Sequence, residues 1–280
     1  PRGDVAYFPR ARRLLQQLET LQRSVQRFGE GDLSVRVSEQ GQDEVADLAR
    51  QFNAAAARIE ALVKTHKSLL ANASHELRSP LTRIRMGLEL MGGNQPSPAF
   101  REEILRNIAE LDQLVDEILL ASRLDAREAD VGTVELVDLI GLAAEECARV
   151  DADLDVTAVP EGLEVRGVAK LLRRALRNLL ENARRYSQGD ITVVLQRHDG
   201  QAQVSVLDRG PGVPPALRER IFEPFYRLPG ASERAGGVGL GLALVRSIAQ
   251  RHNGSVRCED QPDGSGGACF VLRLPLALTK

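Results

Sequence analysis

Apolar residues in the first 62 positions recur at alternating steps of three and four, the pattern of helices that pack as a coiled coil. The first run, within residues 10–28, consists of Leu14, Leu18, Leu21, Val25 and Phe28. Glycines follow it, and the alternation of Leu33, Val35 and Val37 predicts an extended connector. A second helix is predicted from about Asp43, with apolar positions at Val45, Leu48, Phe52, Ala55, Ile59 and Leu62. The pattern therefore predicts two helices, joined by a connector, that both require partners.

The second helix has no stop signal after this run, and its apolar pattern continues to about Met91. Between Leu69 and Leu77 two successive steps of four form a stutter, which locally unwinds a coiled coil. Helix breakers fill residues 92–98, and another helix is predicted over residues 99–124. Two long helices joined by a short loop form an antiparallel hairpin, and one copy cannot bury both of its apolar stripes. The sequence therefore predicts a homodimer with a four-helix bundle.

The pattern changes after residues 126–133, a charged segment that contains glycine and is predicted to be a linker. Short β-branched runs appear at residues 133–137, 154–157, 191–197, 203–208, 255–259 and 269–274. Helical segments lie between them at residues 139–150, 168–187 and 240–252. This alternation predicts an α/β sandwich with helices on one face of a sheet. The pair Asp199-Gly200 between two alternating runs predicts a hairpin turn.

Composition argues against a nucleic-acid-binding protein and a disulfide-stabilised protein. Lys and Arg total 37, Asp and Glu total 39, and the formal net charge is −2, so no strong field for nonspecific nucleic-acid binding is expected. The three cysteines lack metal-type spacing and fit a reducing compartment. No run approaches the roughly 18 apolar residues of a membrane-spanning helix. Tyr7 and Phe8 precede several arginines, an order that fits a segment just inside a membrane and an ordinary amphipathic helix equally well.

His75 is the candidate nucleophile of the long helix. It lies two positions from seam residues on either side, so its ring is predicted to point about 200° away from the seam, outward. A helix histidine is commonly a core or surface filler, but here Glu76 is adjacent, Ser79 lies one turn on, and Pro80 interrupts the helical pattern. A neutral imidazole is a competent nucleophile near physiological pH, and an exposed one is accessible to a separate domain.

Glycines and carboxamides form the candidate phosphate site. Asp208, Gly210 and Gly212 follow a predicted strand, where a carboxylate can accept a hydrogen bond from a base. The glycines of residues 236–241 open a predicted helix, and backbone N–H groups there cradle phosphates; on its own this segment could equally be a flexible loop. Asn178 and Asn182 share one helix face, and a carboxamide oxygen there could bind Mg²⁺, although a polar helix face would look the same.

Together these elements resemble the sensor histidine kinases of two-component systems. The motifs, in order, are Ser74–Leu81, Asn178–Tyr186, Asp208–Gly212, Phe222–Tyr226 and Gly237–Leu242. The first part of the chain is similar to a HAMP signal-relay module, with landmarks at Gly31-Asp32-Leu33, Asp43-Glu44 and Phe52-Asn53. The resemblance covers residues 8–276.

The resemblance implies a multidomain fold. Residues 8–62 would form the coiled-coil HAMP module, and residues 63–125 the dimerisation and phosphotransfer hairpin, a four-helix bundle in the dimer. Residues 126–133 would be the linker. Residues 134–280 would form an α/β sandwich that binds ATP, of the type shared by gyrase, Hsp90 and histidine kinases.

The resemblance also implies roles for individual residues. His75 would be phosphorylated, Glu76 would orient its ring or accept its proton, and Ser79 would act in removing phosphate from the partner. Asn182 and Asn178 would hold Mg²⁺ and phosphates, Asp208 would read the adenine amino group, and Gly210 and Gly212 would hinge a lid. The phosphates would be lined by Gly237, Gly239 and Gly241. The remaining nucleotide contacts would come from Arg185, Tyr186, Arg227 and Leu240.

The implied activity is that of a protein-histidine kinase. It would use ATP and Mg²⁺, phosphorylate His75, transfer the phosphoryl group to an aspartate of a response-regulator receiver domain, and act as a phosphatase toward it. The implied full-length protein is a homodimer in a bacterial inner membrane, and this part of it is cytoplasmic and binds no nucleic acid. Two alternatives are a gyrase- or Hsp90-type ATPase module and a kinase-dead dimeric scaffold.

Overall fold

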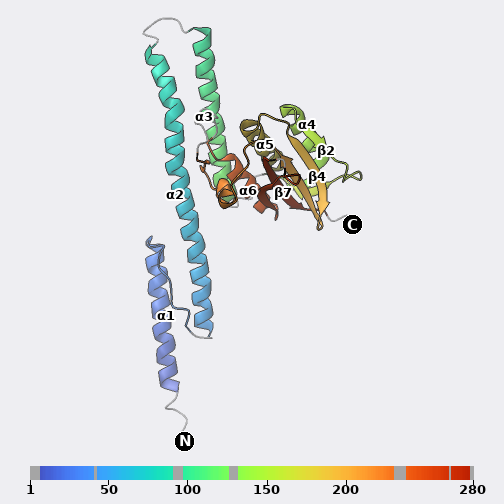
Figure 1. Cartoon of the computed structure of the whole chain (residues 1–280). Coiled ribbons are helices and arrows are strands. Elements are labelled where there is room, and N and C mark those ends of the chain that lie inside the picture. The colour runs from blue at the N-terminus through green and yellow to red at the C-terminus, as the bar shows by residue number, and fades with distance from the viewer. Residues whose placement is uncertain are drawn as a thin grey trace. The chain divides into compact units, whose positions relative to one another are not determined.

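A computed structural model describes residues 7–40, 43–90, 97–125, 132–229, 238–264 and 266–277 of the chain. The chain divides into two compact units, Pro1–Ala71 and Asn72–Lys280. Figure 1 traces the elements of both units in order along the chain. The predicted linker at residues 126–133 lies largely outside the described residues, which resume at residue 132.

The first unit contains helix α1, Tyr7–Gly29, and the beginning of helix α2, Glu44–Leu90. The connector between them is extended as predicted, and it is fixed to α2 by Asn53. The side chain of Asn53 accepts from the Val37 N–H and donates to the Val37 carbonyl, both at 2.8 Å. Helix α2 begins where expected, because the Asp43 carboxylate accepts from the Ala46 N–H at 2.9 Å.

Much of the predicted seam of this unit stays exposed within one chain, although Leu21 is buried and the rings of Phe28 and Phe52 pack together. Side chains of the seam that remain exposed are those of Leu14, Leu18, Val25, Leu48, Ile59 and Leu62. The buried row of α2 is a neighbouring one, formed by Ala46, Ala49 and Ala56 together with the connector-binding Asn53. Small side chains on this row let the connector approach the helix, so the larger apolar groups face outward.

The second unit contains the rest of α2 and helix α3, Pro98–Asp125. Helix α2 runs without interruption through Pro80, so a kink there stays a prediction. The hairpin closes tightly near its loop, because a Cβ added at Gly87 would come within 2.5 Å of the Phe100 ring. Seam residues of this hairpin also remain exposed, namely Leu81, Leu88, Ile108 and Val115.

The remainder of the second unit is an α/β sandwich, as predicted. Its five-stranded sheet has the order β2-β4-β5-β7-β6, and a separate pair joins β1 to β3. The strands are β1 Glu135–Asp138, β2 Asp153–Asp155, β3 Glu164–Gly167, β4 Thr192–His198, β5 Gln201–Leu207, β6 Ser255–Asp260 and β7 Ala268–Pro275. The helices are α4 Leu139–Val150, α5 Ala169–Tyr186 and α6 Gly241–Arg251, with short 3-10 turns η1 Pro215–Leu217 and η2 Arg220–Phe222.

Strand register divides the sheet into an apolar face and a polar face. Val206 of β5 pairs with Val193 of β4 on one side and with Phe270 of β7 on the other. These three side chains are at most 2% exposed, and in β5 the valines alternate with polar residues. On the opposite face of β5 the Gln203 amide donates to the Ser205 hydroxyl at 3.2 Å. The helices therefore cover the apolar face only.

The structure confirms the six strands and the helices expected from the pattern, and it adds β3. Residues 164–167 alternate charged with small residues and pair mainly with the short strand β1, apart from a bridge to Leu276, so their sequence pattern is too short to predict a strand. The predicted hairpin turn is present, with Asp199 at φ 47° and Gly200 at φ 72°.

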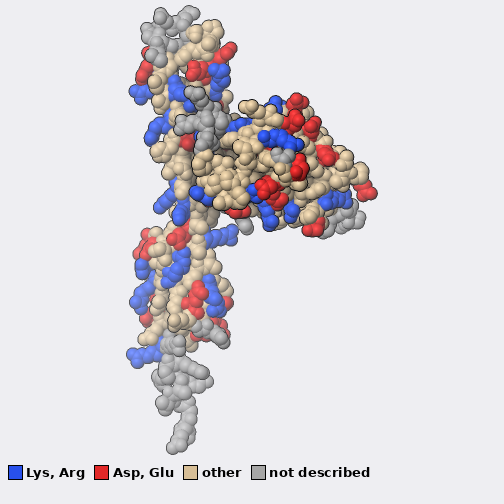
Figure 2. All heavy atoms as spheres, viewed as in Figure 1, with Lys and Arg blue, Asp and Glu red and all other residues tan. Residues whose placement is uncertain are grey.

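Charges of both signs intermix over the described surface. Figure 2 shows Lys and Arg beside Asp and Glu along the helices and around the sandwich, without an extended field of one sign on the visible face. Within the described residues, no helix has both the length and the apolar character needed to cross a membrane.

Candidate active site

A cavity of about 430 Å³ lies in the second unit. It brings together nine of the residues that the sequence predicts for nucleotide binding. These residues are Asn178, Asn182, Arg185, Tyr186, Asp208, Gly212, Arg227, Gly239 and Gly241. They come from α5, the end of β5, the segment after η2, and the start of α6, which are far apart in sequence. The cavity volume is within the range of small-molecule and cofactor sites.

Helix α5 presents the two asparagines to this cavity. The apolar row beside them is buried in the core, which fixes the rotation of the helix. Asn178 is 5% exposed, and its Nδ2 donates to the carbonyl of Gly241 at 3.0 Å. This bond ties α5 to the first residue of α6 and leaves the carboxamide oxygens of Asn178 and Asn182 as acceptors.

Asp208 stands at the end of β5 and is 4% exposed. Its Oδ1 accepts from the Gly210 N–H at 2.8 Å and from the Ala268 N–H at 3.3 Å. Burial raises the pKa of this carboxyl, while the two backbone bonds oppose the shift. In the described part of the chain both bonds use Oδ1, so Oδ2 is the oxygen available to a ligand that donates a hydrogen bond.

Two glycines after Asp208 let the chain turn closely. A Cβ at Gly210 would lie 2.7 Å from the carbonyl oxygen of Tyr186, so a larger residue would push the loop away from α5. Gly212 has φ +73°, a conformation that suits glycine. Gly212 lines the cavity, whereas Gly210 shapes the loop without being part of the lining.

The aromatic segment after η2 supports the other side of the cavity. Phe222 packs edge-on against Phe270, with ring centroids 6.4 Å apart. Phe225 adopts φ 63°, and its N–H donates to the carbonyl of Gly239 at 2.9 Å. Gly239 itself has φ +81°, and a Cβ there would meet the Phe225 backbone at 2.9 Å. This segment therefore anchors the backbone just before α6.

Leu240 is completely buried and belongs to the core beneath the cavity, not to its lining. Gly237, which was predicted to line the phosphates, lies outside the described residues.

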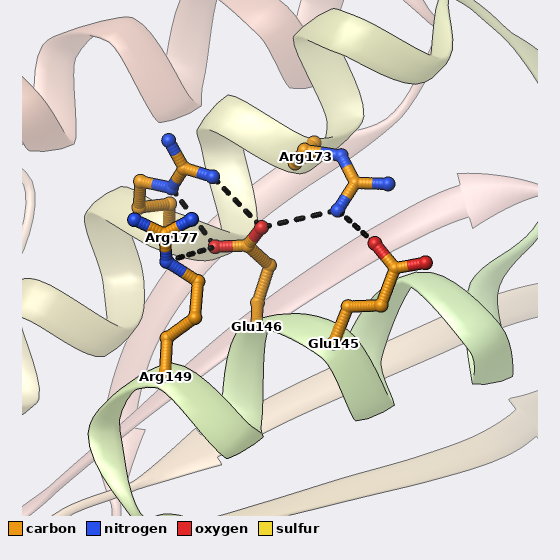
Figure 3. A network of polar contacts seen from close by, with 5 residues as sticks. All are labelled: Glu145, Glu146, Arg149, Arg173 and Arg177. Carbon is orange, nitrogen blue, oxygen red and sulfur yellow. Dashed lines mark hydrogen bonds and ion pairs between the residues drawn. The ribbon is translucent and has the colours of Figure 1, made fainter.

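A charge network holds α5 against α4 behind the cavity. Figure 3 shows the Glu146 carboxylate of α4 surrounded by the guanidinium groups of Arg177, Arg173 and Arg149. Arg177 donates to both oxygens of Glu146 at 2.9 Å, and Arg173 also pairs with Glu145. The bonds from Arg177 outweigh burial and lower the pKa of Glu146, which is 2% exposed. Because Arg177 precedes Asn178, the network fixes the helix that carries the asparagines.

The candidate nucleophile lies on a different element. His75 is exposed on α2, as the seam predicted, with Glu76 partly exposed and Ser79 exposed. None of these three is among the described residues that line the cavity. The structure thus gathers most of the residues predicted for nucleotide binding in one cavity, and it places the predicted phosphoacceptor residues outside its described lining.

Sequence reasoning missed several side chains of the cavity. Glu181 lines it from α5, and its position between Asn178 and Asn182 was the available signal. Helix α3 also contributes lining residues, which are Arg106, Ala109, Glu110, Gln113, Leu114 and Glu117. Arg174 of α5 donates to Glu117 at 2.8 Å. The sequence around Glu117 does not indicate that α3 lies beside α5, because Arg174 is 57 residues further along the chain.

The described residues contain no group of three or more His, Cys, Asp or Glu arranged to hold a metal ion. A resident all-protein metal site is therefore not built here. The carboxamide oxygens of Asn182 and Asn178 do fit Mg²⁺, which commonly takes one or two protein oxygens and completes its shell with phosphates and water. The three cysteines are buried, and burial raises the pKa of the Cys147 and Cys269 thiols to about 11 and that of Cys258 to about 12. They are protonated and poorly nucleophilic.

Three family models match the chain in succession. The HAMP domain matches residues 11–61, the His Kinase A (phospho-acceptor) domain residues 65–127, and the histidine kinase-, DNA gyrase B- and HSP90-like ATPase residues 167–278. The second range includes His75, and the third includes every predicted nucleotide residue.

Curated relatives agree with these models. The sensor protein RstB of Escherichia coli (strain K12) is 35% identical over 267 residues, which are 93% of this chain and 60% of RstB. The signal transduction histidine-protein kinase/phosphatase MprB of Mycobacterium sp. (strain KMS) is 33% identical over 250 residues, 84% of this chain and 48% of MprB. The chain thus spans about half to 60% of the length of these relatives.

Solved structures show the same fold. The histidine kinase ThkA, crystallised in complex with the response regulator protein TrrA, matches with a TM-score of 0.60 and 24% identity. The match covers 84% of this chain and 68% of that one. With three consecutive family models and these relatives, the chain belongs to the sensor histidine kinases of two-component systems.

Proposed function

We propose that this chain binds ATP in the cavity of the sandwich, phosphorylates its own His75, and passes the phosphoryl group to an aspartate of a response-regulator receiver domain. The observation that carries the proposal is the pairing of two features in one chain. One is a cavity lined by Asn178, Asn182, Asp208 and glycines, and the other is an exposed histidine on a helix.

The cavity suits an adenine nucleotide at both ends. Oδ2 of Asp208 would accept from the adenine amino group, since Oδ1 is held by two backbone N–H groups. Apolar lining residues would contact the faces of the base, namely Val213, Ile221, Leu228, Ala268 and Phe270. The N–H groups at the start of α6 and the guanidinium of Arg185 would face the phosphates.

Asn182 would hold Mg²⁺, with Asn178 beside it. The metal, when bound with ATP, neutralises charge on the phosphate oxygens. The role of the chain is to keep the two carboxamides in place. Asn178 does so through its bond to Gly241, and both asparagines depend on the fixed rotation of α5.

The reaction proposed at His75 is an in-line displacement. The unprotonated outer ring nitrogen attacks the γ-phosphorus, an N–P bond forms, and the bond to the bridging oxygen breaks to release ADP. The proton on the other ring nitrogen passes to Glu76 or to solvent. His75 does not line the cavity, so the γ-phosphate would reach it when the sandwich docks on the phosphoacceptor helix of the same or of a second copy, as the predicted linker at residues 126–133 would allow.

The partner is proposed to be a receiver domain. Its aspartate carboxylate would attack phosphohistidine, so that the N–P bond breaks and an acyl phosphate forms. The complex of ThkA with a response regulator supports this proposal. The kinase/phosphatase name of MprB supports a second activity, the hydrolysis of the partner's acyl phosphate. In that hydrolysis water attacks phosphorus and the carboxylate leaves, with Ser79 beside the water.

The dimer is proposed from the exposed apolar stripes. Leu81 is 53% exposed and Leu88 52% on α2, and Ile108 and Val115 are more than 40% exposed on α3. Pairing two hairpins would remove these groups from water and form a four-helix bundle. The membrane attachment and cytoplasmic position implied by the family resemblance stay predictions.

The test is to incubate the chain with Mg²⁺ and ATP labelled at the γ-phosphate, and then to treat the protein with acid and with alkali. We expect label that acid removes and alkali does not, the behaviour of phosphohistidine. His75→Gln should abolish labelling, whereas His66→Gln on the same helix should keep it. Label that persists in His75→Gln would refute the assignment.

The nucleotide side is tested with a matched pair on α5. Arg185 lines the cavity, while its neighbour Arg184 is exposed and is not among the described lining residues. Asn182→Ala should lower the labelling rate by about a hundredfold or more. Arg185→Ala should raise the KM for ATP, and Arg184→Ala should leave it unchanged. Steady ATP hydrolysis without protein labelling would instead favour a gyrase- or Hsp90-type ATPase, and failure to bind ATP would favour a scaffold.

A further inference from the structure

Arg83 makes an unusual set of contacts on the phosphoacceptor helix. It lies on α2 eight residues after His75, about 12 Å along the helix axis. Its Nε donates to the side-chain oxygen of Asn107 at 2.8 Å, and its Nη2 donates to the Glu110 carboxylate at 2.8 Å. Its Nη1 donates to the hydroxyl oxygen of Ser79 at 3.3 Å. One guanidinium therefore joins α3 to the residue one turn beyond His75.

The two anchors on α3 are well placed to hold the guanidinium. Asn107 is 7% exposed, and its own Nδ2 donates to the Glu103 carbonyl at 2.9 Å, so its oxygen is turned toward Arg83. Glu110 adds a charged acceptor one turn away on α3. A planar guanidinium satisfies such separated acceptors at once, which the single nitrogen of a lysine does not.

The consequence for Ser79 follows from hydrogen-bond roles. Residues 75, 79 and 83 are spaced by four, so they lie along one face of α2. Because the Ser79 oxygen accepts from Arg83, its O–H hydrogen and its second lone pair are directed away from Arg83. They are thus oriented on the face that carries His75, where a phosphorylated partner would dock.

We propose that Arg83 is a positioning residue for Ser79 in the hydrolysis of the partner's phosphoaspartate, an inference that rests on the function proposed above. Ser79, held by Arg83, orients the attacking water. Water forms the new P–O bond, the bond to the aspartate oxygen breaks, and the products are inorganic phosphate and a carboxylate. Since the anchors of Arg83 belong to α3, sliding or rotation of α2 against α3 would release Ser79 and lower hydrolysis.

The contacts of Arg83 are expected to affect phosphatase activity and autophosphorylation differently. Autophosphorylation needs His75 and the nucleotide cavity. Among the described residues Arg83 neither bonds to His75 nor lines the cavity, although its partner Glu110 does line it. Hydrolysis needs Ser79 in a fixed orientation. A shift between α2 and α3 should therefore lower phosphatase activity more than kinase activity.

The experiment measures both rates on the full chain. The probe is the receiver domain that the phosphorylated chain labels fastest among purified candidates, and its loss of label is followed with ADP and Mg²⁺ present. Arg83→Lys should slow this hydrolysis about tenfold and change His75 labelling by less than about twofold. Arg85→Lys is the matched control, since Arg85 pairs only with Glu89 of its own helix among the described residues, and it should behave as wild type.

A double-mutant cycle distinguishes positioning from a structural role. In a Ser79→Ala background, Arg83→Lys should produce no further loss, because the hydroxyl that it positions is gone. Asn107→Ala should reproduce the loss in the wild-type background, with the thermal midpoint measured to confirm folding. Wild-type hydrolysis in Arg83→Lys, or a full further loss in Ser79→Ala, would overturn the inference. Absence of His75 labelling in the wild type would refute the proposed function instead.

Discussion

Leucines of the sandwich and leucines of the helices have opposite environments. Leu179 and Leu195 of the sandwich are not exposed at all, whereas Leu81 and Leu88 of α2 are each more than half exposed. The sandwich closes its core with its own sheet and helices. The helical part has apolar stripes that one chain leaves in contact with water. The difference teaches that the sandwich buries its own core, while the helical part has apolar stripes that the proposed dimer would cover.

The largest expected effect is on dimerisation through the exposed apolar stripes of the helices. Leu88→Asp combined with Val115→Asp should weaken dimerisation by at least about 4 kcal/mol, because each chain of the dimer loses two buried apolar groups. Analytical ultracentrifugation measures the dissociation constant. Leu136→Asp is the control, because Leu136 is 56% exposed on β1 and lies outside the stripes. A dimer unaffected by the double substitution would contradict the comparison.

The next largest effect is on the stability of the sandwich. Glu146→Gln should cost about 3 kcal/mol of unfolding free energy, since the partly buried guanidinium of Arg177 loses its carboxylate. Urea unfolding of the sandwich measures this change. Glu145→Gln is the matched control, because Glu145 is 63% exposed and should cost less than about 1 kcal/mol. Equal costs for the two variants would show that the buried network does not stabilise α4 against α5.

A smaller effect concerns the backbone before α6. Gly239→Ala should cost about 2 kcal/mol, because the new Cβ is strained at φ +81° and meets the Phe225 backbone. Affinity for ATP should fall with it. Gly200→Ala has a similar φ of +72° with nothing within 4 Å, so it should cost only about 1 kcal/mol and leave ATP binding intact. Isothermal titration with ATP separates the two outcomes.

The smallest effect is a pH dependence confined to the sandwich. Nε2 of His252 accepts from the Val168 N–H at 3.0 Å, and burial lowers the pKa of this imidazole from 6.5. Below about pH 6.5 the unfolded chain binds a proton that the folded chain resists. The free energy of unfolding should therefore decrease as the pH is lowered, by at most about 1.4 kcal/mol per pH unit. His252→Gln should reduce this slope between pH 6.5 and 5.5, and an unchanged slope would contradict the assignment.

Much of the fold was predictable because the spacing of apolar residues reflects which side of each helix or strand is buried. The alternation of apolar residues in β4, β5 and β7 reflects a sheet with one apolar face, and His75 points outward because it lies off the seam. The pattern did not distinguish which row of α2 faces its connector. A row of alanines with Asn53 does so, and the larger seam residues stay exposed.

The rest depended on contacts between distant residues. Strand β3 is only four residues long and pairs mainly with the equally short β1, so its residues carry little pattern of their own. The residues proposed to bind nucleotide were predicted from specific motifs, and nine of them line one cavity. Glu181 and the α3 lining were not predicted. Arg83 looked like any helix-face arginine in the sequence. Its role emerged only when Asn107 and Glu110, 24 and 27 residues away, were found beside it.

The central claim is that the sandwich delivers a phosphoryl group from ATP to one exposed imidazole. Fragmentation mass spectrometry of the chain after incubation with ATP and Mg²⁺, kept at alkaline pH, locates the modified residue directly. The account predicts a phosphoryl group on His75, which disappears when Asn182→Ala is used. A phosphoryl group on another residue, or on His75 of the Asn182→Ala variant at the wild-type rate, would contradict it.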